Sequence, residues 1–284
     1  MDVNPALDQL ALGDHVCCPV SATEQTWAVA AAGTACGLRD GQMVLFIVDD
    51  PDGLRGFLTG TVAGAERALA TGQLQVHPSA GTDTRDAGFN ADQMVDMLRA
   101  EIDLADRQGF AGVRATGDFL STIVRQRHNT DAVIDYERQA NAIFAEGHIL
   151  GICHYDPRAL ASATWQRVFS AHPTTLLPTG NGTLTRLHGA RIPSGIRLTG
   201  TADLANRDAL PALLAGVVAI PGACRIDTRG LEFVDVPAIG CLLRTAAARS
   251  GRPTIIVCGT QLAGLLHLCG ARSLPDLVVT AESP

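Results

Sequence analysis

Continuous apolar runs alternate with helical segments over residues 9–175, and this alternation constrains the fold more than any other feature of the chain. Runs such as 43–50 (MVLFIVDD) and 148–156 (HILGICHYD) are apolar at most positions, which is typical of strands buried on both faces. Between them, residues 90–109 have apolar side chains at helical spacing, and Asn90 is placed to cap that helix. We therefore expect an α/β fold in which helices cover both faces of a mostly parallel sheet.

Polar side chains gather at the predicted carboxyl ends of these strands. In an open parallel sheet, ligands bind outside those ends, which fall here at residues 17–18, 49–50, 117–118 and 153–156. The predicted helix 130–147 adds a tyrosine and a glutamate. The candidate ligand-binding residues are His15, Cys17, Cys18, Asp118, Tyr136, Glu137, Cys153, His154 and Tyr155. The alternatives are a turn or helix cap for Asp118, and a packed ring beside a solvated acid for Tyr136 and Glu137.

Composition excludes several classes of function. Hydrophobic residues make up 46% of the chain, yet no apolar run approaches the length that spans a bilayer, and residues 1–10 lack the pattern of a signal peptide, so a cytoplasmic protein without disulfides is expected. The net charge of −7 and the absence of a basic run argue against nucleic acid as a partner. All 22 basic residues are arginine, which excludes the usual phosphate-loop and Schiff-base chemistries because both need a lysine.

Five short motifs follow one another along the first half of the chain: GDHVCC, GLRDGQMVLFIVDD, VRATGDF, DYERQANAIF and ICHYD. In this order they resemble the MEDS family, a sensory domain named for methanogens and methylotrophs, over roughly residues 9–175. The resemblance implies a fold related to RecA-like ATPases that has lost its phosphate loop, and a role in sensing small, hydrocarbon-like molecules. The place of the loop is taken by CCPVSATEQTW, which contains neither glycine nor lysine.

The same resemblance places the first strand in the centre of the sheet, with residues 148–154 beside it. His15, Cys17, Cys153 and His154 are then the candidates for a zinc or other thiophilic metal site. Strand alternation argues against it, because neighbouring residues of one strand point to opposite faces, and the chain has no CxxC pair. The favoured interpretation is a buried strand end with a histidine or thiol facing a pocket, without a metal or other cofactor. His172, which precedes Pro173, is expected in a loop.

The second half of the chain, residues 195–281, resembles a STAS domain, the module of anti-sigma factor antagonists and sulfate-transporter tails. Gly200, Asp203, Asp227 and the segment 231–235 (LEFVD) carry the resemblance. It implies a surface that binds an anti-sigma factor or a related regulatory protein, through Asp203, Asp235, Val236, Pro237 and Ala238. Switchable members have a serine or threonine directly after the aspartate, whereas here Val236, Pro237 and Ala238 have no hydroxyl.

We therefore expect a non-enzymatic signalling protein with a sensory domain at 1–178, a linker at 179–194 and a STAS domain at 195–284. A small ligand would shift how the sensory domain packs on, or exposes, the STAS surface. One alternative is a metal- or thiol-redox-sensing adaptor that works through the His/Cys strand ends. Another is a degenerate nucleotide-binding enzyme, for which only scattered acids such as Asp49 and Asp156 are available. A homodimer is compatible with either, and no membrane contact is expected.

Overall fold

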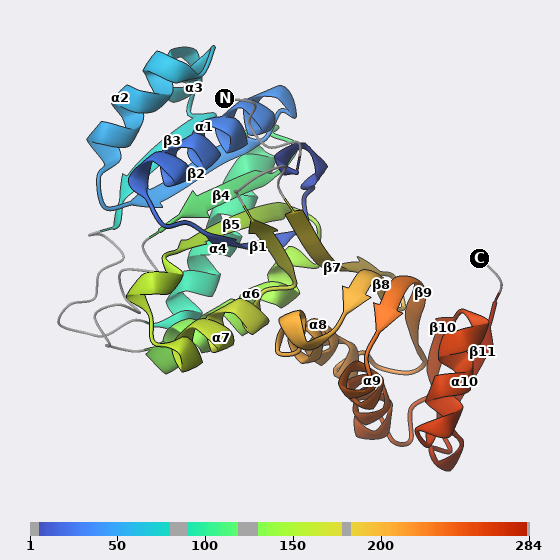
Figure 1. Cartoon of the computed structure of the whole chain (residues 1–284). Helices are drawn as coiled ribbons and strands as arrows, with labels where there is room; N and C mark the ends of the chain where they lie inside the picture. Colours follow the sequence, from blue (N-terminus) through green and yellow to red (C-terminus); the bar gives the residue numbers. More distant parts are fainter. Residues whose placement is uncertain (1–5, 80–89, 119–129, 178–182, 283–284) are drawn as a thin grey trace.

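The structure, a computed structural model, describes residues 6–79, 90–118, 130–177 and 183–282. In these residues the chain forms one eleven-stranded sheet with the strand order β11-β10-β9-β8-β7-β6-β1-β5-β4-β2-β3 (Figure 1). Neighbouring strands are parallel except for the pairs β6–β7 and β7–β8. The expectation of an α/β fold with a mostly parallel sheet is confirmed.

Strands of the N-terminal unit are short and alternate with helices. The strands are β1 (His15–Pro19), β2 (Met43–Val48), β3 (Leu74–Pro78), β4 (Val113–Gly117), β5 (Ile149–Tyr155) and β6 (Thr174–Leu177). The helices are α1 (Thr23–Arg39), α2 (Pro51–Thr61), α3 (Ala65–Thr71), α4 (Ala91–Arg107), α6 (Thr130–Phe144) and α7 (Ser162–Ala171), with 3-10 turns at Leu7–Gln9 (η1) and Pro157–Ala159 (η3). Asn90 caps α4 as predicted, since its side chain accepts from the backbone N–H groups of Asp92 and Gln93.

The helices bury the sheet from both sides. On one face, α4, α6 and α7 pack over side chains that include Cys17, Ile149 and Tyr155. On the other face, α1 and α2 pack over side chains such as Phe46 and Cys18 (Figure 1). Each face therefore has its own core, and two consecutive residues of one strand belong to different cores.

Strand β1 lies between β5 and β6, in the interior of the sheet. Its register with β5 places Cys17 opposite Cys153 and Cys18 opposite His154. The expectation that the 148–154 strand lies beside the first strand is confirmed, and so is the expectation that Cys17 and Cys18 point to opposite faces.

Residues 183–192 form a strand, β7 (Thr183–Ile192), where the sequence suggested part of a linker. It pairs antiparallel with β6 and with β8 (Gly195–Ala202), so the sheet continues into the second half of the chain. Side chains also attach this strand to the N-terminal unit, because Arg186 and His188 both contact the buried carboxylate of Asp14. Residues 178–182 of the predicted boundary region lie outside the described residues.

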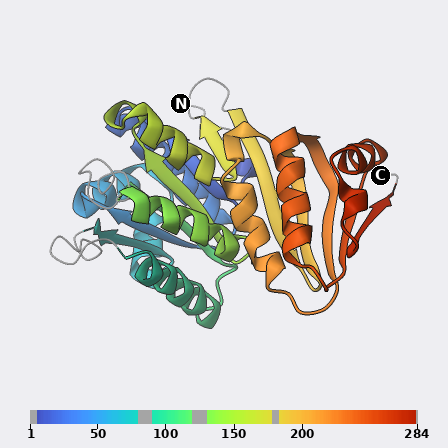
Figure 2. The same ribbon diagram turned by 90° about the horizontal axis from the view of Figure 1, so that it is seen from below.

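The C-terminal unit continues the parallel alternation of strands and helices. After β8 come a 3-10 turn η4 (Leu204–Asn206), α8 (Ala209–Val218), β9 (Cys224–Val234), α9 (Val236–Ala248), β10 (Thr254–Cys258), α10 (Thr260–Leu268), a 3-10 turn η5 (Ala271–Ser273) and β11 (Leu277–Ala281). Figure 2 shows α8 and α9 side by side over the strands. Arg249, fully buried, donates to the carbonyl groups of Val217, Ile220 and Gly222 and so joins α9 to the end of α8.

Among the described residues, no helix combines the length and the apolar character that crossing a bilayer requires.

Candidate metal centre

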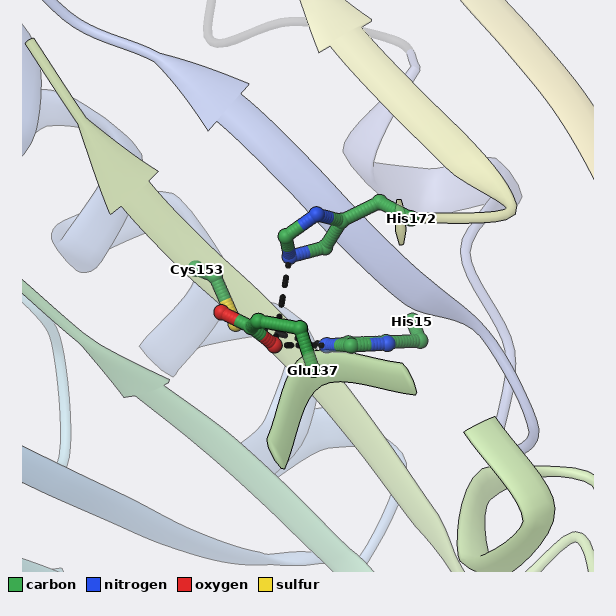
Figure 3. A group of neighbouring side chains, drawn as sticks. All are labelled: His15, Glu137, Cys153 and His172. Carbon is green, nitrogen blue, oxygen red and sulfur yellow. Dashed lines mark hydrogen bonds and ion pairs between the residues drawn. The ribbon is translucent and has the colours of Figure 1, made fainter. Parts of the chain in front are cut away.

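Four side chains with metal-binding atoms converge beneath the sheet, on the face covered by α6 and α7. They are His15 from the start of β1, Glu137 from α6, Cys153 from β5, and His172 from the connection between α7 and β6 (Figure 3). One ligand atom from each lies within 4.8 Å of the others. His15, Glu137 and His172 are buried and Cys153 is partly buried. We call these four residues the His/Glu/Cys cluster.

Glu137 lies at the centre of the cluster. Its Oε2 atom is 3.0 Å from His15 Nε2 and 3.5 Å from His172 Nε2. The thiol of Cys153 is 3.5 Å from His15 Nε2. The other carboxylate oxygen, Oε1, accepts a hydrogen bond from the hydroxyl of Tyr155. One oxygen of Glu137 is therefore held by the protein, while the other faces both imidazoles.

The outer hydrogen bonds determine which ring nitrogens carry protons. Asn141 donates through its amide to the carbonyl of Ala171 at 2.8 Å, so its oxygen accepts from His15 Nδ1, also at 2.8 Å. His172 Nδ1 lies 2.8 Å from the carbonyl of Val168, a group that can only accept. The second nitrogen of each ring, Nε2, faces Glu137.

This arrangement leaves buried polar atoms with open bonding capacity. Glu137 Oε2 and His172 Nε2 are buried, and neither has a hydrogen-bond partner among the described residues. Two imidazole nitrogens and a carboxylate oxygen thus converge in a dry interior, where unsatisfied polar atoms are costly. A bound cation would satisfy them.

Burial and charge set the protonation of the cluster. Burial and the neighbouring His172 lower the pKa of His15. Burial by itself would raise the pKa of Glu137, but His172 and His15 together hold it well below its usual range. Burial, and next the charge of Glu137, raise the pKa of the Cys153 thiol, so a metal entering this site would displace a thiol proton.

The donor set fits zinc or another thiophilic divalent metal. Imidazole nitrogen, thiolate sulfur and carboxylate oxygen are the common ligands of Zn²⁺, and four of them complete a tetrahedral site. Ligand histidines usually donate their second N–H to a carbonyl or carboxylate group, which orients the ring, and both histidines here do so. The ring of Phe144 stacks on His15 with 4.4 Å between centroids and further fixes its plane.

The structure brings together some of the predicted site residues and separates the others. His15, Glu137, Cys153 and Tyr155 meet at the cluster. Cys17 and Tyr136 lie on the same face and pack in its core, whereas Cys18 is buried in the core of the opposite face. Asp118 and His154 line a separate cavity on that opposite face. Of the four candidates for a metal site, His15 and Cys153 lie in the cluster, whereas Cys17 and His154 do not.

Glu137 and His172 belong to the cluster but were not among the candidates for a metal site. His172 was expected in a loop, but it is buried because the β6 strand that follows it pairs with β1, next to His15. The cluster also lies at the first residue of β1 rather than at the carboxyl ends of the strands, where ligands were expected. For Glu137 a sequence signal was available. It falls among the buried positions of α6, on the helix face that also carries apolar side chains.

Residues 14–173 match the model of a protein family described as MEDS, the MEthanogen/methylotroph, DcmR Sensory domain. That segment is more than half of the chain and contains all four residues of the cluster. The chain belongs to the MEDS family. This confirms the first of the two resemblances seen in the sequence, and the N-terminal unit is a member of a family of sensory domains. The MEDS model does not extend over residues 174–284.

None of the curated proteins matches the chain. Among solved structures, it is similar to the flagellar accessory protein FlaH from Methanocaldococcus jannaschii, with 12% identity, a TM-score of 0.45, and coverage of 72% of this chain and 87% of FlaH. It is also similar to the PH0250 protein from Pyrococcus horikoshii OT3, with 10% identity, a TM-score of 0.38, and coverage of 62% and 88%. EccC from Thermomonospora curvata (ATPases 2 and 3) has 13% identity, a TM-score of 0.33, and coverage of 94% and 76%.

Proposed function

We propose that this MEDS protein senses through a divalent metal ion held by His15, Glu137, Cys153 and His172, and passes the signal to a partner protein through its C-terminal unit. The observation that carries the metal is the convergence of two imidazole nitrogens, a carboxylate oxygen and a thiol within 4.8 Å of one another in a buried site. All four groups are common ligands of Zn²⁺, and a bound cation would give each of them a partner.

A metal accounts for the cluster better than thiol redox chemistry. Reactive thiols have a lowered pKa and some exposure to solvent. Here burial raises the pKa of Cys17, Cys18 and Cys153 well above the usual range, to about 12 for Cys18. The described cysteines near the cluster are therefore inert as free thiols, and Cys153 becomes a thiolate only when a metal takes its proton.

The partner surface that we propose is a groove between the two units. A cavity of about 660 Å³ is lined by Phe169 of α7 and, in the C-terminal unit, by Leu204, Phe233, Asp203 and Asp235. Leu204 and Phe233 are 67% and 55% exposed, unusually high for large apolar side chains. Two of these residues, Asp203 and Asp235, are positions where the resemblance to STAS domains implies contacts with an anti-sigma factor or a related regulator.

The start of α9 supports the resemblance to STAS domains in part. The Asp235 side chain caps α9 by accepting from the Ala238 N–H at 2.8 Å, and Pro237 lies in the first turn. Asp203 caps η4 in the same way, by accepting from the Ala205 N–H. Val236 is 68% exposed, so its side chain is available to a partner, although it cannot be phosphorylated.

A direct route joins the cluster to the groove. His172 directly follows α7, the helix that contributes Phe169 and Ser170 to the groove. Ser170 donates to the carboxylate of Asp208 at 2.6 Å, which ties α7 to the beginning of α8. A metal that binds one position of His172 better than another would therefore shift α7 and the groove together.

The experiment is a metal titration of the full chain purified without a metal-affinity column. We expect one equivalent of Zn²⁺ or Co²⁺ per chain, and the Co²⁺ form should show a sulfur-to-cobalt charge-transfer band. Cys153→Ser should abolish the band, and Glu137→Gln and His172→Gln should weaken binding by at least about 100-fold, more than the loss of an outer hydrogen bond costs. Cys18→Ala is the matched control, since this buried thiol faces the other side of the sheet. Stoichiometric binding that survives Cys153→Ser would refute the assignment.

A further inference from the structure

A second cavity lies on the opposite face of the same sheet. It has a volume of about 150 Å³ and is bounded by the start of α1, by α2, and by the carboxyl-end residues of β2, β4 and β5. Cys153 points into the metal cluster, while its neighbour His154 lines this cavity. The two consecutive residues therefore serve two separate sites. None of the metal ligands lines the second cavity.

His154 has unfulfilled hydrogen-bonding capacity at this place. The side chain is 2% exposed, and its Nε2 atom has no hydrogen-bond partner among the described residues. A buried imidazole nitrogen without a partner is costly to keep in a protein interior unless a ligand completes it.

The cavity has an apolar wall and an acidic mouth. Trp27, Phe46 and Leu54 supply the wall, and Asp49, Asp50 and Asp118 bring three carboxyl groups. Ser79 donates to Asp49, and Asp50 also accepts from the Gly53 N–H, so both carboxylates are held in place. No arginine lines the cavity in the part of the chain that the structure describes. Three carboxyl groups at one mouth suit a ligand that carries a positive charge.

The spacing of the carboxylates points to an organic cation rather than a metal ion. Among the described residues, only the His/Glu/Cys cluster gathers three or more metal-binding groups closely enough to hold an ion. The three aspartates are thus spread around the cavity, which suits a ligand of several atoms. The indole of Trp27 adds a π face that attracts ammonium groups.

We propose that this cavity binds a small organic ammonium ion, with its charged nitrogen toward the aspartates and His154 and its alkyl part against Trp27, Phe46 and Leu54. A cavity of this size holds a molecule about as large as benzene, which limits the ligand to roughly six heavy atoms. The inference goes beyond the proposed metal site and does not depend on it, because the two sites share no residue.

The test is isothermal titration calorimetry of the full chain with n-butylammonium, 1-butanol and butyrate. We expect butylammonium to bind, and butanol and butyrate to bind at least about tenfold more weakly, because a hydrogen bond to a charged group is worth more than a neutral one. Asp118→Asn and Asp49→Asn should each weaken butylammonium binding by about 10-fold or more. Trp27→Leu should weaken it by about 2- to 30-fold.

Two controls separate this site from its surroundings. Asp52→Asn removes a nearby carboxylate of α2 that is 91% exposed and does not line the cavity, so it should bind like wild type. Cys153→Ser should also bind butylammonium like wild type, even though it loses the metal. Circular dichroism confirms that each variant is folded. Equal affinity for butanol and butylammonium, wild-type affinity in both aspartate variants, or no binding by primary ammonium ions from methyl to hexyl would each overturn the proposal.

Discussion

At the residue scale, Glu137 shows how a buried charge is held. One oxygen accepts from Tyr155, and the other faces His15 and His172. We predict that Tyr155→Phe destabilises the metal-free protein by about 1.5–3 kcal/mol, because it leaves a buried carboxylate oxygen without its donor. Urea unfolding of the single variants and of the double variant with Glu137→Gln measures this coupling. If Tyr155→Phe destabilises the Glu137→Gln protein as much as it destabilises the wild type, the hydroxyl does not act through the carboxylate.

His154 makes the stability of the protein depend on pH. Its pKa is lowered by burial from 6.5 to about 4 in the folded protein. Between these values the unfolded chain binds the proton more readily, so stability is complete above about pH 6.5 and falls as the pH drops toward 4. The contribution of this one residue is about 3 kcal/mol. Unfolding measured at several pH values should show a shallower decline for His154→Gln than for wild type, and parallel curves would contradict the prediction.

At the element scale, helix α9 depends on a single buried arginine. Arg249 satisfies the carbonyl groups that end α8 and the loop after it, through Val217, Ile220 and Gly222. We predict that Arg249→Met lowers the free energy of unfolding by at least about 3 kcal/mol, because several buried acceptors lose their donor. Arg244→Met, at an exposed position of the same helix, should change it by less than about 0.5 kcal/mol. Denaturant melts compare the two, and similar losses would refute the assignment.

The first turn of α9 carries a second prediction. The residue after Asp235 is an exposed valine, so a kinase that recognises this surface finds no hydroxyl there. We predict no phosphate at residue 236 after incubation with a cognate anti-sigma kinase and ATP, followed by mass mapping. Val236→Ser supplies the missing hydroxyl at a helix N-terminus, where added negative charge is favourable, and should become labelled. Label on the wild-type peptide would show that this interpretation of the surface is wrong.

Local sequence patterns explain which strands and helices could be predicted from the sequence. Continuous apolar runs placed β2 and β5 correctly, and period-two alternation correctly sent Cys17 and Cys18 to different faces. Strand pairing is not local, however, and nothing near His172 indicates that β6 lies beside β1. Strand β7 was missed for a related reason, since its segment was interpreted from its Gly, Pro, Thr and Asn residues, whereas its contact with Asp14 through Arg186 is not local. The metal cluster therefore needed the fold before its members could be recognised together.

At the scale of the whole molecule, one sheet runs through both units. Asp14, with its side chain fully buried, accepts two hydrogen bonds of 2.9 Å from Arg186, and His188 lies 3.0 Å away on the same strand. We predict that the two units unfold in a single cooperative transition. Asp14→Ala should weaken the connection and split the calorimetric transition into two, because Arg186 and His188 lose their shared partner. Two transitions in wild type would contradict the prediction.

The four residues of the proposed metal site come from four separate stretches of the chain, from β1, α6, β5 and the residue after α7. In an unfolded chain these groups are dispersed, so almost all of the binding free energy belongs to the folded form. An occupied site then adds RT ln(1 + [M]/Kd) to the free energy of unfolding of the protein, where [M] is the free metal concentration. In a cell, where proteases remove transiently unfolded chains, a gain of 1–2 kcal/mol changes abundance several-fold. The lifetime of the protein in the cell would thus depend on the concentration of free metal. This dependence would act in addition to any movement of α7.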